Sequence, residues 1–85
     1  MHKIFLYDIK GNKRTEAIID IEDYERCKQH KWCVGPGGYV WGNKIGFLSH
    51  FVFRRKPKAG FEMDHIDGDK FNNRRMNIQE ITYHF

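Results

Sequence analysis

The chain has 85 residues, of which 40% are hydrophobic, 15% aromatic and 31% charged. We expect one small domain, because a chain of this size buries only about 60–65% of its unfolded surface and cannot hold a large pocket and a regulatory unit. The hydrophobic content excludes a disordered chain. No apolar run is long enough for a membrane span or for a signal peptide at the start.

The net charge of +4 is unevenly distributed along the chain. Residues 1–43 carry seven basic and six acidic side chains, whereas residues 44–85 carry eight and five. Four of the five residues 54–58 are basic: Arg54, Arg55, Lys56 and Lys58. Such a cluster favours a polyanion, of which nucleic acid is the commonest in a cell. A solvated loop explains it equally well.

The first half of the chain predicts strands around one helix. Strand formers at residues 3–8 and 15–19 flank a turn at residues 10–13. Asp20 is a good N-cap and predicts a helix over residues 22–30, with Tyr24 and Cys27 on its inner face.

A hairpin is predicted next, with strands at residues 32–34 and 39–41 around the glycine-rich turn 35–38. That turn lacks the Gly-Lys-Ser/Thr ending of a phosphate loop. The aromatic residues of the two hairpin strands, Trp32, Tyr39 and Trp41, fit a core better than a base-stacking surface.

The second half predicts shorter elements, and the expected class is α+β, a small antiparallel β domain with one or two short helices. These elements are a strand at 45–48, a short helix at 49–55, an extended segment at 61–65, a polar turn at 67–69, a helical turn at 72–76 and a last strand at 78–82.

Two cysteines raise the question of a zinc site. Cys27, His30 and Cys33 are spaced three residues apart, and His50 would be a fourth ligand. This spacing matches no standard zinc pattern. We therefore expect no structural zinc and two free thiols that pack as small core residues. A zinc-stabilised interaction domain stays as a rival function.

Residues 61–78 concentrate side chains suited to phosphodiester hydrolysis. Asp64 offers hard oxygen ligands to a divalent cation, and the neutral imidazole of His65 can take a proton from water. Because the two are adjacent on an extended segment, their side chains should point to opposite faces. Further oxygen donors and phosphate binders follow: Asp67, Asp69, Asn72, Asn73, Arg74, Arg75 and Asn77. An ordinary polar turn is the alternative.

The run from Asp64 to Ile78, D-H-I-D-G-D-K-F-N-N-R-R-M-N-I, resembles the core of the HNH endonucleases of phage and mobile-element type. Upstream segments resemble the amino-terminal region of those proteins, so the resemblance covers nearly the whole chain from Ile18 onward. The matching segments are 21–25, 31–32, 38–40, 48–50 and 57–60.

The resemblance implies a ββα-metal fold and a role for each motif residue. His65 would be the general base, Asp64 a metal ligand, and Asn77 the residue that holds the base-bearing loop and orients His65. The cation would be Mg²⁺ or Mn²⁺, and the substrate double-stranded DNA, nicked or cut. Phosphate contacts would come from Arg54, Arg55, Lys56, Lys58, Lys70, Arg74 and Arg75, and His50, Asp67, Asp69 and Asn73 would lie beside the site.

The family motif ends with a further metal ligand about nine residues after Asn77, on the helix of the ββα unit. Position 86 would follow Phe85, so we expect that helix to be missing, with His84 as a stand-in ligand. On a helix, His84 would lie about 200° from the expected face. A truncated chain, an inactive remnant and a partner chain completing the site are the three explanations.

These observations predict one HNH-like domain over residues 1–85, with a β-rich DNA-binding or scaffold part at 1–53 and the motif at 54–85. We expect a cytoplasmic protein of a bacterial or phage-infected cell. A homodimer is an alternative to the monomer, since an uncovered last strand favours association. The rival to the endonuclease is a catalytically inactive DNA-binding remnant.

Overall fold

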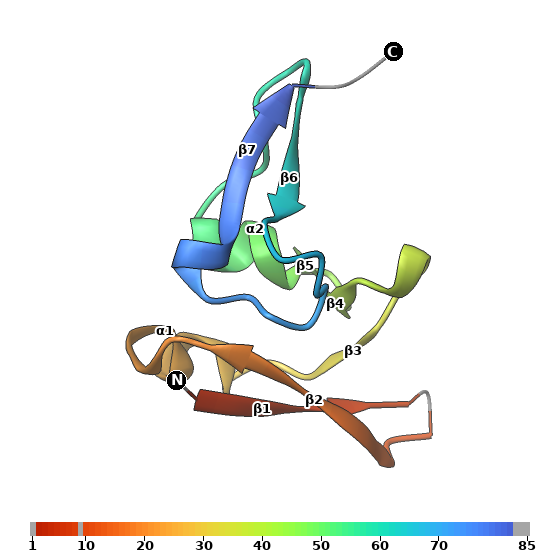
Figure 1. Cartoon of the computed structure of the whole chain (residues 1–85). Coiled ribbons are helices and arrows are strands. Elements are labelled where there is room, and N and C mark those ends of the chain that lie inside the picture. Colours follow the sequence, from red (N-terminus) through yellow and green to blue (C-terminus); the bar gives the residue numbers. More distant parts are fainter. Residues whose placement is uncertain (1, 9, 83–85) are drawn as a thin grey trace.

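The computed structural model describes residues 2–8 and 10–82. Five strands form the main sheet in the order β2-β1-β3-β4-β5, and β6 and β7 form a separate ribbon that stands away from it (Figure 1). The class is α+β, as predicted. The elements are β1 (His2–Tyr7), β2 (Lys13–Ile19), α1 (Ile21–Cys27), β3 (Trp32–Val34), the 3-10 turn η1 (Pro36–Gly38), β4 (Val40–Gly42), β5 (Gly46–Phe47), α2 (Leu48–Phe53), β6 (Phe61–His65), the 3-10 turn η2 (Arg75–Asn77) and β7 (Ile78–Thr82).

The main sheet is mixed, so the prediction of a purely antiparallel domain was wrong. β1 pairs antiparallel with β2 but parallel with β3, where Leu6 lies opposite Trp32 and Tyr7 opposite Cys33. A parallel pair needs a crossover of about a dozen residues or more. The segment that contains β2 and α1 supplies this crossover. β3, β4 and β5 continue as antiparallel neighbours.

Helix α1 ends three residues before its predicted end at residue 30. The carbonyl of Cys27, in its last turn, accepts the indole N–H of Trp32 at 2.8 Å and the backbone N–H of His30 at 3.1 Å. This carbonyl has no hydrogen-bond partner within the helix, and residues that follow the helix donate to it instead. The chain therefore turns toward β3 here.

Asp20 occupies the N-cap position, as predicted, but its carboxylate does not cap the helix. It accepts the backbone N–H of Arg75 at 2.8 Å instead. The residue thus ties the start of α1 to the motif segment.

The glycine-rich hairpin between β3 and β4 is confirmed. The backbone N–H of Gly35 donates to the carbonyl of Tyr39 at 2.7 Å. Gly37 and Gly38 have φ angles of 70° and 82°, which favour glycine for steric reasons. β5 is shorter than predicted, because α2 already begins at Leu48.

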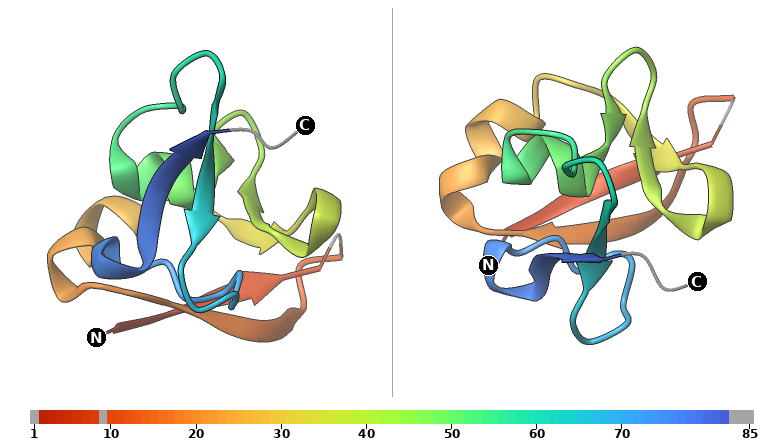
Figure 2. Two further views of the ribbon diagram at one scale, coloured as in Figure 1. Left: turned by 45° about the horizontal axis from the view of Figure 1, so that its top comes forward. Right: turned by 90° about the horizontal axis from the view of Figure 1, so that it is seen from above.

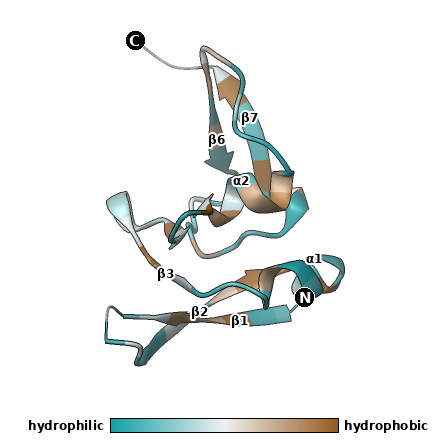
Figure 3. Ribbon diagram, turned by 180° about the vertical axis from the view of Figure 1, so that it is seen from behind, coloured by the Kyte–Doolittle hydropathy of each residue, from teal (hydrophilic) through white to brown (hydrophobic). Residues whose placement is uncertain are grey.

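The core lies between the main sheet and the helices and centres on Trp32. Figure 3 shows α1 as largely hydrophilic and α2 as mostly apolar, so α2 contributes more to this core. The buried apolar residues are Ile4, Leu6, Ala17, Ile19, Cys27, Trp32, Val40, Leu48, Val52 and Ile78.

The segment between β6 and β7 fastens the ribbon to the main sheet. Ile18 on β2 donates its N–H to the carbonyl of Phe71 and accepts the N–H of Asn73, both at 2.8 Å. This segment runs along β2 (Figure 2). The helical turn predicted at residues 72–76 is the 3-10 turn η2, one to three residues later.

β6 and β7 supply two antiparallel strands, with His65 opposite Ile78. The expected loss of the helix of a ββα unit concerns residues after Thr82, which lie outside the described part of the chain, as does His84. Within residues 2–8 and 10–82, no helix has both the length and the apolar character needed to traverse a membrane.

Candidate functional site

His65 lies at the end of β6 and is held by Asn73. The imidazole is 7% exposed, and its Nε2 lies 3.0 Å from Oδ1 of Asn73. The amide nitrogen of Asn73 donates to the carbonyl of Lys70 at 3.1 Å. A carbonyl only accepts hydrogen bonds, so this contact fixes the amide with Oδ1 toward the imidazole. Nε2 of His65 is therefore the donor, and in the neutral ring Nδ1 carries the lone pair.

Asp64 lies on the other face of the ribbon, as its position next to His65 predicted. Its Oδ2 accepts a hydrogen bond from Nε2 of Gln79 at 2.9 Å, from the residue directly opposite on β7. No other hydrogen bond reaches this carboxylate within the described residues.

The donor set at Asp64 fits a hard, hydrated cation. Mg²⁺ is typically held by one or two carboxylates, with several waters and substrate phosphates completing its shell. Within residues 2–8 and 10–82 there is no group of three or more His, Cys, Asp or Glu side chains that would hold a metal ion. A site here would therefore rest on at most two such side chains of the described residues, with waters and substrate phosphates completing the shell.

Asn77 fastens the loop that follows His65. Its amide nitrogen donates to Oδ1 of Asp67 at 2.9 Å and to the carbonyl of Asn72 at 2.8 Å, and its Oδ1 accepts the N–H of Asp67 at 3.0 Å. The resemblance implied that Asn77 would also orient His65. The side chain that contacts the ring is Asn73, so the two roles are divided between two asparagines.

The carboxylate of Asp67 organises the same loop. Hydrogen bonds from the side chain of Asn72, the N–H of Asp69 and the side chain of Asn77 lower the pKa of Asp67 below its usual range. Asp69 closes a tight turn by accepting the N–H of Phe71 at 2.9 Å. Both aspartates thus hold the loop in the structure.

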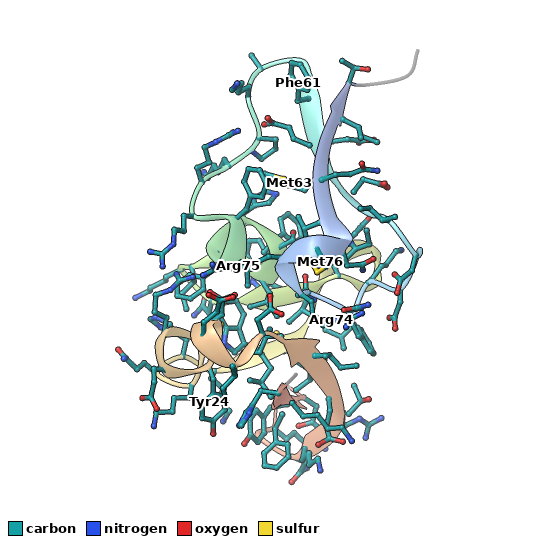
Figure 4. All side chains as sticks on the ribbon, turned by 60° about the vertical axis from the view of Figure 1, so that its left-hand side comes forward. Tyr24, Phe61, Met63, Arg74, Arg75 and Met76 are labelled. Carbon is teal, nitrogen blue, oxygen red and sulfur yellow. The ribbon has the colours of Figure 1, made fainter. Side chains whose placement is uncertain are left out.

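Two of the predicted phosphate-binding arginines are engaged by carboxylates. Arg55 makes two hydrogen bonds to Glu80, at 2.8 and 2.9 Å. These bonds and the N–H of Lys58 lower the pKa of Glu80 to about 2. Arg75 reaches from η2 to α1 (Figure 4), where it bonds Asp23 at 2.6 and 3.0 Å.

The other predicted phosphate-binding side chains form no ion pair with a carboxylate in the part of the chain that the structure describes. Lys70 donates to the carbonyl of Gly37 at 2.6 Å, and Nε of Arg74 donates to Oδ1 of Asn72 at 3.1 Å. Within the described residues, no ion pair holds the side chains of Arg54, Lys56 and Lys58, and all three are exposed.

His50 lies near the site without touching His65. It lines a hollow of about 240 Å³ with Tyr39 and Glu62, and the ring centroid of Tyr39 is 6.0 Å from that of His65. Burial and the charge of Lys56 lower the pKa of His50. Sequence reasoning placed Tyr39 in the core and missed its position beside His65, because nothing local relates residues 39 and 65.

Of the residues considered for zinc, Cys27 and His30 line one hollow with Lys28 and Trp32. Cys27 is buried, which together with the charge of Asp23 raises its thiol pKa to about 11. Sγ of Cys33 donates to the carbonyl of Trp41 at 3.3 Å. The ring of His30 packs edge-on against Trp32 and Phe51.

Comparison with known proteins gives one informative similarity. The chain is 26% identical over 76 residues to a protein of Acanthamoeba polyphaga mimivirus described as an uncharacterized HNH endonuclease. The match covers 82% of this chain and 41% of the mimivirus protein, so the chain spans less than half of that relative. No family model matches the chain, and no solved structure matches it.

Proposed function

We propose that this chain is a divalent-metal-dependent DNA endonuclease that hydrolyses phosphodiester bonds through residues 64–77. The observation that carries the proposal is the hydrogen bond between His65 and Asn73, in which the orientation of the amide assigns the donor role to Nε2. Asn73 engages Nε2, which leaves the lone pair of Nδ1 to act as a base. The similarity to the mimivirus protein supports the same class of reaction.

In the proposed reaction, Nδ1 of His65 accepts a proton from water while the water oxygen attacks the phosphorus. The bond from phosphorus to the 3′ oxygen breaks, the 3′ oxygen takes up a proton from solvent, and a 5′ phosphate remains on the other product. Asn73 stabilises the imidazolium that forms, because its Oδ1 keeps the hydrogen bond from Nε2. Asn77 and Asp67 hold the loop that positions both groups.

Asp64 is the proposed ligand for Mg²⁺ or Mn²⁺, and His84 is retained as a second proposed ligand. A divalent cation would supply positive charge that stabilises the scissile phosphate and the leaving oxygen. Gln79 orients the carboxylate of Asp64 through its hydrogen bond to Oδ2.

The proposed substrate is double-stranded DNA, contacted through its backbone. Arg54, Lys56 and Lys58 are among the basic side chains that form no ion pair within the described residues. Arg55 and Arg75 contribute less to DNA binding, because Glu80 and Asp23 offset their charges.

A second candidate function is a DNA-binding module that has lost catalysis. The burial of His65, at 7% exposed, favours it, since a general base must reach a water molecule. This form would bind DNA without metal, in a salt-sensitive way, and would break no strand.

Incubation of the protein with supercoiled plasmid tests the proposal, with Mg²⁺, Mn²⁺ or EDTA at low salt. We expect nicked or linear DNA with metal only, and its loss in His65→Ala and Asp64→Asn. Arg55→Ala serves as a charge control that should still cut. An intact plasmid that is retarded on the gel would favour the second candidate function.

A further inference from the structure

One face of the main sheet carries a row of aromatic side chains that the proposed reaction does not use. Residues directly opposite each other on neighbouring strands point to the same face. Tyr7 lies opposite Cys33, Cys33 opposite Trp41, and Trp41 opposite Phe47. These four residues therefore share the face that points away from Trp32 and the core.

Ring contacts extend the row in both directions. Phe5 lies 6.5 Å from Tyr7, Trp41 lies 5.1 Å from Phe47, and Tyr39 lies 5.8 Å from Phe47, measured between ring centroids. The last ring is 6.0 Å from the imidazole of His65. We call this set the aromatic row: Phe5, Tyr7, Trp41, Phe47 and Tyr39. It crosses the sheet from β1 to the candidate active site.

Lysines accompany three of the five rings of the row. The amines of Lys13, Lys31 and Lys70 lie over rings of the row, at 4.2, 5.0 and 4.5 Å from the respective ring centroids. At the centre, Tyr7 and Cys33 line a hollow of about 600 Å³, together with Lys31 and Arg14.

Carboxylates on this side offset part of the positive charge, and Glu62, which lines a hollow with Tyr39 and Phe47, is one of them. Asp8 lies 3.9 Å from Arg14, and Glu16 lies 3.9 Å from Lys13. Lys31 and Lys70 have no ion pair within the described residues. The face therefore remains basic, which suits a polyanion.

Aromatic rings with adjacent cations suit an unpaired nucleic-acid strand. Its bases can stack on the rings while its phosphates meet the lysines, whereas the bases of a duplex are already stacked on one another. We infer that the aromatic row binds a single-stranded stretch of DNA and leads it to His65. This inference rests on the proposed function for its choice of DNA and for the direction toward His65.

Fluorescence anisotropy in EDTA tests the inference without cleavage. The probe is a labelled oligothymidine of about 12 nucleotides, compared with the same strand paired to its complement. We expect the full chain to bind the single strand at least about fivefold more tightly than the duplex, the gain expected from one stacked base.

Variants of the row should remove this preference. Phe5→Ala and Tyr7→Ala should each weaken single-strand binding about fivefold or more and leave duplex binding unchanged. Tyr7→Phe keeps the ring and should bind like the wild type. Phe5 is 48% exposed, so its replacement should leave the fold intact, and thermal melting checks this.

Lys28 provides a matched charge control for Lys31. Each amine lies over a tyrosine ring, that of Lys28 at 5.6 Å from Tyr24 on α1, but the charge of Lys28 is offset by Glu25 at 3.0 Å. Lys31→Ala should weaken single-strand binding more than Lys28→Ala. Equal effects, equal affinity for duplex and single strand, or unchanged binding by both alanine variants of the row would each overturn the inference.

The two proposals fail in different ways. A chain that prefers the single strand but cuts no plasmid would refute the nuclease and leave the binding surface standing. A chain that cuts plasmid without this preference would refute the aromatic row alone.

Discussion

At the residue scale, the candidate site depends on one amide. Asn73 is 1% exposed and connects the ring of His65 to the backbone of Lys70. A buried polar group left without a partner costs about 1–3 kcal/mol. The orientation of the base and the stability of the loop are therefore coupled through this side chain.

We expect Asn73→Ala to lower the free energy of unfolding by about 1–3 kcal/mol and to reduce plasmid nicking by about 10²–10⁴-fold. Urea titrations and nicking rates measure the two effects. Met76→Ala is the control, because Met76 is 92% exposed and should change stability by less than about 0.5 kcal/mol. Unchanged stability and nicking in Asn73→Ala would contradict the role given to this amide.

The ion pair between Arg55 and Glu80 leads to a prediction of how the stability of the fold changes at acidic pH. The pKa of Glu80 is lowered from 4.5 to about 2, chiefly by the hydrogen bonds from Arg55. A carboxyl group whose pKa is lower in the folded state stabilises the fold above its unfolded pKa. This contribution is lost as the pH falls from about 4.5 toward 2.

Glu80→Gln should therefore be less stable than the wild type near neutral pH, and the difference should shrink as the pH falls through that range. Thermal melts of both proteins from pH 6 to pH 2 measure it. A stability difference that stays constant with pH would show that the pair does not titrate as described.

At the scale of elements, a network of charges joins α1 to η2. Asp23 is fully buried and bonds both Arg26 and Arg75. Burial alone would raise the pKa of Asp23, but the hydrogen bonds from Arg75 and Arg26 outweigh it and hold the pKa below its usual range. The ionised carboxylate is the form that anchors the turn.

Asp23→Asn should lower the free energy of unfolding by about 2–4 kcal/mol, because two guanidinium groups lose their buried partner. The side chains of Arg26 and Arg75 are 30% and 40% exposed, so the cost should stay below that of a fully buried pair. Glu22→Gln removes a carboxylate that is 61% exposed and 3.3 Å from Arg75, and should cost less than about 1 kcal/mol. Chemical denaturation of both variants decides the matter, and equal costs would contradict the network.

The elements themselves were largely predictable from local sequence. The strand at 78–82, the extended segment at 61–65 and the helix at 49–55 follow from local pattern and agree with β7, β6 and α2 within two residues. The end of α1 and the parallel pairing of β1 with β3 were not predictable. Both depend on Trp32, whose indole satisfies Cys27 and whose strand pairs with β1 only in the folded chain.

The candidate site, too, was predictable from the sequence only in part. Asp64, His65 and Asn77 lie within fourteen consecutive residues, so their motif is visible in the sequence. The contact of Tyr39 with His65 and the hydrogen bond from Lys70 to Gly37 join residues 26 and 33 positions apart. Contacts of this range arise from tertiary packing and leave no local signal.

At the scale of the whole molecule, the ribbon and the main sheet are joined by two backbone hydrogen bonds and by the carboxylate of Asp20. Ile18 exchanges two hydrogen bonds with the segment at residues 71–73, and Asp20 accepts the N–H of Arg75. The boundary at residue 53 was drawn from the sequence alone. In the structure, these hydrogen bonds connect the two parts that it separates. We therefore expect both parts to unfold together.

Native-state hydrogen exchange measures this coupling amide by amide. The amides of Ile18 and Asn73 should exchange with the same free energy as those of β1, because opening them requires global unfolding. The amides at the outer end of the ribbon, near Phe61 and Thr82, should exchange faster. If the amides of Ile18 and Asn73 exchanged at a much lower free energy than β1, the two parts would open separately.

The position of the proton on His65 underlies the function proposed for the whole molecule, and nitrogen-15 NMR of the ring measures it directly. At a pH where the imidazole is neutral, we predict a proton on Nε2 and a lone pair on Nδ1 in the wild type, with both tautomers populated in Asn73→Ala. A wild-type ring with its proton on Nδ1, or one that exchanges freely between tautomers, would contradict the assignment of His65 as a preorganised general base.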